Sequence, residues 1–101
     1  MNKNADAIIE VRFKTPSEGG RKSPISGNVY SCPLLIDGEG FDCRIPLGDR
    51  RIELGQTYDL EVRFLFRDLA MPHLAPGRAI SLWEGREIAN GKIKAVAPVL
   101  S

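Results

Sequence analysis

The chain has 101 residues, of which 43% are hydrophobic, and its 14 Lys and Arg against 13 Asp and Glu give a net charge of +1. This size and composition are typical of a folded protein, and we expect residues 1–101 to form a single domain. The balanced charge lacks the basic excess of dedicated nucleic-acid-binding proteins, so any contact with RNA requires a local basic patch.

The sequence has no apolar run of about 20 residues, the length that spans a membrane. Residues 1–6 also lack the apolar core of a signal peptide, so we expect a cytoplasmic location. Cys32 and Cys43 fall on one face of a predicted hairpin, where a disulfide between them is geometrically possible. Because the cytoplasm is reducing, we expect two buried free thiols instead.

Alternation of apolar and polar residues predicts two strands in the first third of the chain, at 7–14 and 28–36. The inward face of the first comprises Ala7, Ile9, Val11 and Phe13. Between them, residues 15–27 are too polar and too rich in Gly and Pro for a strand or a helix. Pro33 cannot donate to a ladder, so the second strand is expected to be at an edge, bulged or bent there.

Asp37-Gly38 is a strong hairpin signal between the second strand and residues 41–47. A two-residue turn places Cys32 directly opposite Cys43, whereas a four-residue turn over 37–40 places them diagonally. In both cases the apolar residues of the two strands lie on one face, and this agreement supports the pairing.

The second half of the chain adds further short strands. Residues 52–54 form a short strand or bend, and residues 68–77 a long loop. The clearest strand is 57–66, whose inward face comprises Tyr58, Leu60, Val62, Phe64 and Phe66. Two more follow at 78–84 and 87–97, with inward faces of Ile80 and Leu82, then Ile93, Ala95 and Ala97. About six such strands predict an all-β protein, either an antiparallel sandwich or a barrel. Because closing the sheet removes free edges, we favour a small closed antiparallel β-barrel that is Greek-key-like.

The residues favour a protein that is not an enzyme. His73 is the single histidine, in a loop flanked by prolines with no nucleophile motif near it. Cys32 and Cys43 with one histidine do not match structural zinc spacing, so we expect no metal and no cofactor. No nucleotide-binding P-loop is present, since Gly19-Gly20-Arg21-Lys22-Ser23 is too short for that pattern.

The loop at 15–25 is the first candidate binding site. Gly19 and Gly20 stand next to Arg21 and Lys22, an arrangement that can present backbone N–H groups and positive charge to an anion or a carboxylate. The alternative is a simple connection between strands. Trp83 is the second candidate, because it faces away from Ile80 and Leu82. It is either an exposed interface aromatic or packed under the 68–77 loop.

Glu18-Gly19-Gly20-Arg21, followed by Pro24, and the later Trp83-Glu84-Gly85-Arg86 resemble the C-terminal β-barrel domain (domain III) of translation elongation factor Tu. The order of strands, loop and turn is similar over residues 7–96. These residues resemble neither the nucleotide-binding domain nor the middle barrel of the factor, so the resemblance does not imply GTP hydrolysis. Residues 34–44 are shorter than in the family, and the 84–86 turn lacks one glycine.

In that family the barrel contacts the T-stem of aminoacyl-tRNA and binds protein partners, including the nucleotide domain of its own chain. The resemblance implies that Arg21, with Lys22, lies near an RNA backbone, and that Glu84 and Gly85, with Arg86, form the turn that approaches the RNA. Two hypotheses follow: a protein-interaction module for a translation-related or nucleotide-binding partner, and a weak tRNA- or RNA-backbone-binding module. The net charge favours the first, and the Gly-Gly-Arg-Lys loop favours the second.

Overall fold

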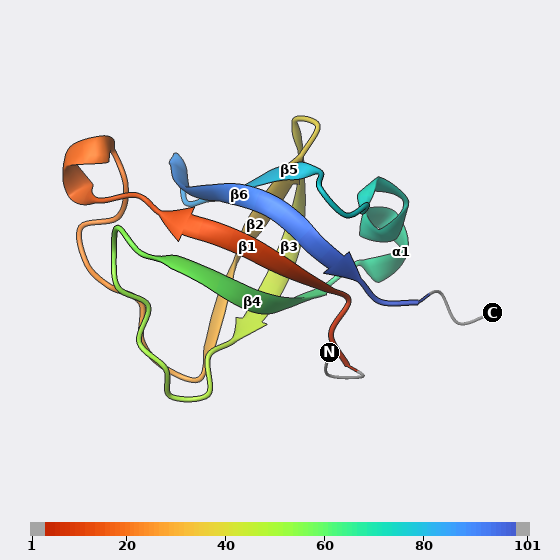
Figure 1. Ribbon diagram of the computed structural model, residues 1–101, viewed down its shortest axis with the longest axis horizontal. Helices are drawn as coiled ribbons and strands as arrows, with labels where there is room; N and C mark the ends of the chain where they lie inside the picture. Colours follow the sequence, from red (N-terminus) through yellow and green to blue (C-terminus); the bar gives the residue numbers. More distant parts are fainter. Residues whose placement is uncertain (1–3, 99–101) are drawn as a thin grey trace.

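The computed structural model describes residues 4–98, which form a closed antiparallel barrel of six strands (Figure 1). The strands are β1 (Ala7–Phe13), β2 (Val29–Ile36), β3 (Glu39–Pro46), β4 (Thr57–Phe64), β5 (Ala79–Trp83) and β6 (Glu87–Val96). Around the barrel their order is β1-β4-β3-β2-β5-β6. Because β2, β3 and β4 are consecutive neighbours and β1 lies beside β4, this is a Greek key, and the predicted fold class is confirmed.

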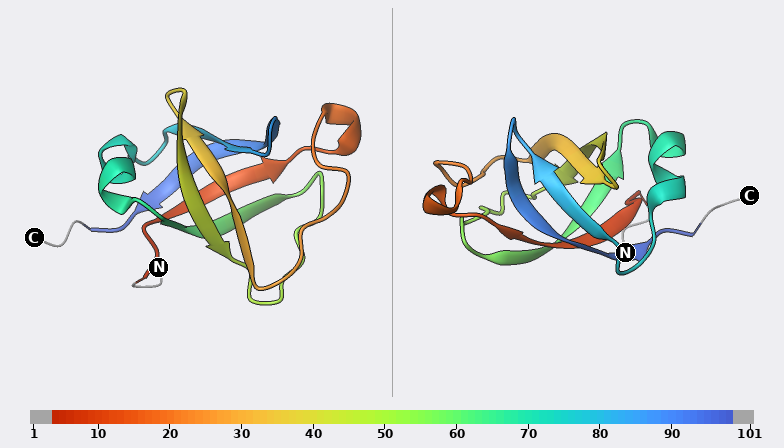
Figure 2. Two further views of the ribbon diagram at one scale, coloured as in Figure 1. Left: turned by 180° about the vertical axis from the view of Figure 1, so that it is seen from behind. Right: turned by 90° about the horizontal axis from the view of Figure 1, so that it is seen from above.

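The core lies inside the barrel and is built from the faces that alternation predicts. The four inward residues of β1, Ala7, Ile9, Val11 and Phe13, are fully buried. The opposite walls contribute Leu34 and Ile36 of β2, Leu60 and Val62 of β4, and Leu82 of β5. The β2–β3 hairpin crosses β1, β4 and β6 on the other side of the barrel, so the core is enclosed by two crossing layers (Figure 2).

A two-residue turn connects β2 and β3. Asp37 and Gly38 have φ angles of 55° and 80°, as the hairpin turn of type I′ requires, and Cys32 stands directly opposite Cys43. The four-residue turn is therefore wrong. Pro33 lies in regular register with β3, and on the other side the β2–β5 ladder contains only Leu34 and Leu35 of β2. β2 is thus no free edge strand, but its ladder with β5 ends at the proline.

The predicted strand 57–66 ends at Phe64, so Phe66 was wrongly assigned to the core. Phe66 is 59% exposed, and the chain turns there into the short helix α1 (Arg67–Ala70), followed by a 3-10 turn at Met71–His73. Asp6 fixes this end, because its carboxylate accepts hydrogen bonds from the Phe64 N–H and from Arg67 Nε, both at 2.8 Å. Ala70 of α1, not Phe66, is buried in the core.

The inward face predicted for the last strand is wrong beyond Ile93. The β1–β6 register shifts between Ile8 and Ile9, where Ala95 and Ile93 are the partners, so Lys94 is the extra residue of a bulge. A bulge reverses the alternation. Val96, opposite Ala7, packs against the core in place of the predicted alanines 95 and 97.

Helical structure occupies little of the described chain. Besides α1 and the 3-10 turn that follows it, a single 3-10 turn lies at Pro16–Glu18, inside the loop predicted to have no helix. No helix among residues 4–98 has the length and apolar character to cross a membrane.

Candidate functional site

The two segments identified through the resemblance lie against each other, although they are far apart in the sequence. The loop at 15–25 and the turn at 84–86 line one open hollow of about 270 Å³, to which Gly20, Arg21, Lys22, Ser23, Glu84, Arg86 and Ile88 contribute. We call this the loop–turn hollow. Glu84 joins its two sides, because its carboxylate pairs with the Arg21 guanidinium and accepts a hydrogen bond from the Tyr30 hydroxyl.

The glycine pair does not present free N–H groups to an anion, contrary to the expectation. The N–H of Gly19 donates to the Pro16 carbonyl at 3.1 Å, and that of Gly20 to the Thr15 carbonyl at 3.0 Å. Gly19 has the positive φ of 89° that ends the 3-10 turn, and Gly20 is buried against the Lys14 backbone, where a Cβ would overlap the carbonyl. Both glycines are needed for the loop conformation.

Arg21 is held within the protein. It pairs with Glu84, donates from Nε to the Ser23 carbonyl at 3.1 Å, and lies 5.7 Å from the centre of the Tyr30 ring. Its charge is therefore largely compensated. Lys22 and Arg86 are exposed on the same hollow, and neither forms an ion pair with another of the residues 4–98.

The turn at 84–86 is tight, and it separates Trp83 from the loop–turn hollow. Gly85 has a φ of 73°, and the N–H of Glu84 donates to the Arg86 carbonyl at 2.9 Å. Trp83 is 38% exposed and lines a different hollow, on the outer face of β5 and β6 with Asn90. The loop 68–77 contributes nothing to that hollow.

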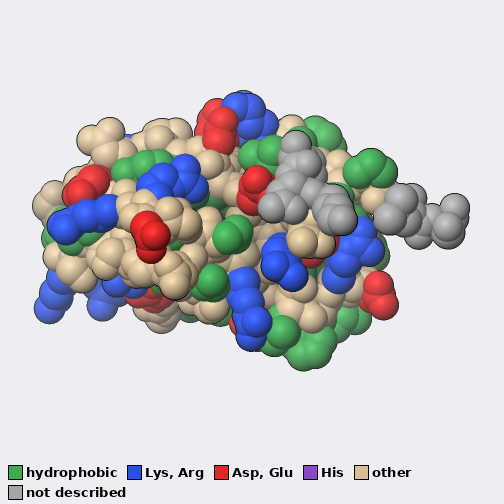
Figure 3. Space-filling view, turned by 90° about the horizontal axis from the view of Figure 1, so that it is seen from below, with side chains coloured by type: hydrophobic (Ala, Val, Ile, Leu, Met, Phe, Trp, Pro, Cys, Tyr) green, Lys and Arg blue, Asp and Glu red, His purple; other side chains and the backbone are tan. Residues whose placement is uncertain are grey.

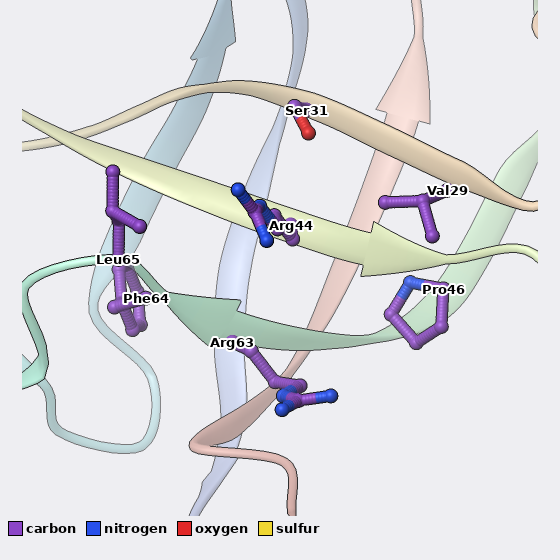
Figure 4. A pocket seen from close by; sticks show the side chains of 7 residues that line it. All are labelled: Val29, Ser31, Arg44, Pro46, Arg63, Phe64 and Leu65. Carbon is purple, nitrogen blue, oxygen red and sulfur yellow. The ribbon is translucent and has the colours of Figure 1, made fainter.

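A second surface, which the sequence did not reveal, lies across β2, β3 and β4 and continues onto α1. Its centre is an open hollow of about 580 Å³ (Figure 4) lined by Val29, Ser31, Arg44, Pro46, Arg63, Phe64 and Leu65. Leu65 also borders a smaller hollow formed with Phe66 and Leu69 at α1. We call this continuous area the Leu65 surface.

The Leu65 surface is apolar at both ends and positive in the middle. Val29, Leu65, Phe66 and Leu69 are each more than half exposed, at 54%, 53%, 59% and 64%. In Figure 4, Arg44 and Arg63 lie between Val29 and Leu65, as neighbours on β3 and β4. Figure 3 shows Lys and Arg side chains interspersed with hydrophobic ones on the underside of the molecule.

The two arginines have no acidic partner in the described part of the chain. Arg44 and Arg63 are directly opposite each other in the β3–β4 ladder, and neither forms an ion pair within residues 4–98. Like charges at such positions repel, so the pair concentrates positive potential on the sheet. An incoming carboxylate would relieve this repulsion.

One sequence signal could have revealed the Leu65 surface. Leu65 and Phe66 are adjacent, so a single strand face cannot contain both, and the pair breaks the alternation of β4. The arginine pair had no such signal, because Arg44 and Arg63 meet only through the register of β3 with β4.

The described residues offer no metal cluster, and His73 has a structural environment. Among residues 4–98, no three His, Cys, Asp or Glu side chains are grouped so as to hold a metal ion. The His73 ring packs 4.9 Å from that of Phe41, and its Nε2 lies 3.5 Å from a Glu39 oxygen.

No protein-family model matches the chain, and no curated protein matches it either.

Proposed function

We propose that the protein is a non-enzymatic interaction module that binds another protein through the Leu65 surface. The observation that carries the proposal is the grouping of exposed apolar side chains. Of the five large hydrophobic residues exposed among residues 4–98, four belong to this surface and only Trp83 lies elsewhere. Exposed apolar side chains grouped on one surface are characteristic of interfaces, whereas scattered hydrophobic residues are ordinary.

The charge of the surface indicates the chemistry of the partner. Arg44 and Arg63 are available for carboxylates, and Arg and aromatic residues are enriched at interfaces. The partner segment therefore presents apolar side chains next to Asp or Glu. The resemblance to the elongation factor barrel suggests a cytoplasmic translation-related or nucleotide-binding protein that carries such a segment.

Affinity capture from a native lysate, followed by binding measurements with the isolated partner, tests this proposal. Leu65→Asp should reduce affinity at least about tenfold, because it places a charge in the apolar contact. Arg63→Glu should slow association and reduce its salt dependence, because it neutralises the charge of the arginine pair. Trp83→Ser, on another face, is the matched control and should bind normally. A partner whose affinity is unchanged by Leu65→Asp but lost in Trp83→Ser would contradict the proposal.

RNA-backbone binding is the second candidate, and the shared position of Lys22 and Arg86 on the loop–turn hollow favours it. Because Arg21 is compensated by Glu84, we assign the phosphate contacts to Lys22 and Arg86. Lys22→Glu and Arg86→Glu should each weaken tRNA binding. Each should also reduce the slope of the logarithm of the binding constant against the logarithm of salt concentration by the equivalent of about one phosphate contact. Arg63→Glu is the matched charge-reversal control. RNA binding that is insensitive to salt and to both variants would exclude this candidate.

A further inference from the structure

Cys32 and Cys43 form a juxtaposed pair of free thiols that neither proposed function uses. They are direct cross-strand partners in the β2–β3 hairpin, and their exposed fractions are 7% and 2%. The hairpin therefore places the two cysteines directly opposite each other before any reaction.

The register of the hairpin makes their separation compatible with a covalent bond. A two-residue turn makes Ile36 and Glu39 a hydrogen-bonded pair, and alternation makes Cys32 and Cys43 another such pair. The Cα atoms of a hydrogen-bonded antiparallel pair are about 5.5 Å apart. Disulfides span Cα separations of about 4.4–6.8 Å, so the backbone spacing is compatible with the bond. Its formation requires the two Cβ atoms, about 5.5 Å apart in a pair of this kind, to approach to about 4.5 Å or less.

The surroundings distinguish the two thiols. Donation from the Cys43 thiol, then from the Trp83 backbone N–H, together with the nearby Arg21 charge, lowers the pKa of Cys32 against the opposing effect of burial. The hydrogen bond to Cys32 and burial raise the pKa of Cys43. Both cysteines border an open hollow of about 280 Å³ with Pro33, Asp42 and Arg44, whose side chains lie on the opposite face of the hairpin from the buried thiols. A small molecule therefore reaches the sulfur atoms when the hairpin opens locally.

We propose that Cys32 and Cys43 are a modification site at which a peroxide forms a reversible intramolecular disulfide. The Cys32 thiolate attacks one peroxide oxygen, the O–O bond breaks, and the products are Cys32 sulfenic acid and hydroxide. The Cys43 sulfur then attacks the Cys32 sulfur and displaces hydroxide, which leaves as water with the Cys43 proton. Two thiols are oxidised by two electrons, and one hydrogen peroxide becomes two waters.

The fold predicts which cysteine reacts first and how the bond is reversed. Cys32 is the attacking residue, because a thiolate is the nucleophile and its neighbours favour that form. Cys43 resolves the sulfenic acid, because it stands directly opposite. A small thiol such as glutathione reduces the bond by thiol–disulfide exchange when the hairpin opens locally.

Mass spectrometry of the folded wild-type protein after treatment with hydrogen peroxide is the deciding experiment. We expect the protein to lose two hydrogen atoms, both cysteines to become inaccessible to alkylation after denaturation, and reduced glutathione to restore both. The product should remain monomeric. Two alkylatable thiols after exposure to peroxide, or disulfide-linked dimers alone, would overturn the proposal.

Single variants test the order of reaction. Cys43→Ser should stop at a Cys32 sulfenic acid that the reagent dimedone traps, whereas Cys32→Ser should react with peroxide at least about tenfold more slowly. Equal reactivity in both variants would overturn the assignment of Cys32. If a serine variant fails to fold, the corresponding alanine variant takes its place, and the wild-type experiment is unaffected.

Discussion

At the scale of single residues, Glu84 holds the loop–turn hollow together. Its carboxylate contacts Arg21 from one segment and Tyr30 from β2, while the side chains of the Arg21–Glu84 pair are only 24% and 32% exposed. Partly buried hydrogen bonds to a charged group contribute more to stability than surface ion pairs do. The position of the turn thus depends on one side chain.

We expect Glu84→Gln to lower the free energy of unfolding by about 1 kcal/mol, because the amide is uncharged and pairs more weakly with Arg21 and Tyr30. Urea denaturation measures the change. Glu53→Gln is the matched control, since its partner Arg51 is 62% exposed and Glu53 is 52% exposed. That control should lie within about 0.5 kcal/mol of wild type. Equal losses in the two variants would show that Glu84 is an ordinary surface residue.

At the scale of elements, Gly91 permits β6 to close the barrel against β1. A Cβ at this position would overlap the carbonyl oxygen of Glu10 and the backbone of Val11. Gly40 on β3 differs, because a Cβ there would come no nearer than 3.9 Å to Pro33.

Gly91→Ala should therefore reduce stability by about 2 kcal/mol or more, since the clash is with backbone that cannot move aside without shifting a strand. Gly40→Ala, which adds the same methyl group in open space, should leave stability within about 0.5 kcal/mol of wild type. Thermal unfolding followed by circular dichroism distinguishes the two. An unchanged midpoint for Gly91→Ala would contradict the close approach of β1 and β6.

The end of β4 is tested by two neighbouring phenylalanines. Phe64 is 7% exposed and Phe66 59% exposed, so the same truncation should have opposite outcomes. Phe64→Ala should destabilise the protein by about 3–5 kcal/mol, as loss of a core aromatic does. Phe66→Ala should change stability by less than about 1 kcal/mol while weakening partner binding. If Phe66→Ala is the more damaging variant, β4 continues into the core as the alternation implied.

Most of the strands and their inward faces could be predicted, because burial of one sheet face imposes a period of two on the sequence. The prediction failed where the backbone breaks that period: at Phe66, where Asp6 ends β4, and at the Lys94 bulge. The Lys94 bulge has no local sequence signal, and the adjacent Leu65 and Phe66 are the one signal of the break at Phe66. The meeting of Arg21 with Glu84, and of Arg44 with Arg63, depends on long-range register, which no short motif encodes.

At the scale of the whole molecule, exposed charge pairs set how stability varies with pH. Hydrogen bonds from the Thr15 backbone and from Arg12 lower the pKa of Glu18, and hydrogen bonds from Lys14 and Asn90 lower that of Glu87. The hydrogen bond to Asp59 raises the pKa of Lys94. The protein is thus stabilised by the ionised carboxylates of Glu18, in the 3-10 turn, and Glu87, on β6, and by the charged Lys94, which is also on β6.

Stability should fall at both ends of the pH range. A carboxylate with a lowered pKa contributes above its ordinary value of 4.5 and loses that contribution as the pH falls through the folded value. Lys94 contributes below 10.5 and loses its contribution as the pH rises through its raised pKa. The urea concentration at the midpoint of unfolding, measured from pH 3 to pH 11, reports both the loss of stability at low pH (the acid limb) and the loss at high pH. Glu87→Gln should flatten the acid limb alone, and an unchanged acid limb would contradict the role of Glu87.

The pairing of β1 has a consequence for folding during synthesis. β1 leaves the ribosome first of the six strands, but it lies between β4 and β6, whose residues begin at 57 and 87. Until β4 and β6 have been synthesised, the edges and the apolar face of β1 have no native partner. Unpaired strands of this kind bind chaperones or aggregate. Non-local pairing of this kind also folds slowly. A nascent chain halted before residue 87 can therefore hold five strands and still be unable to complete its barrel.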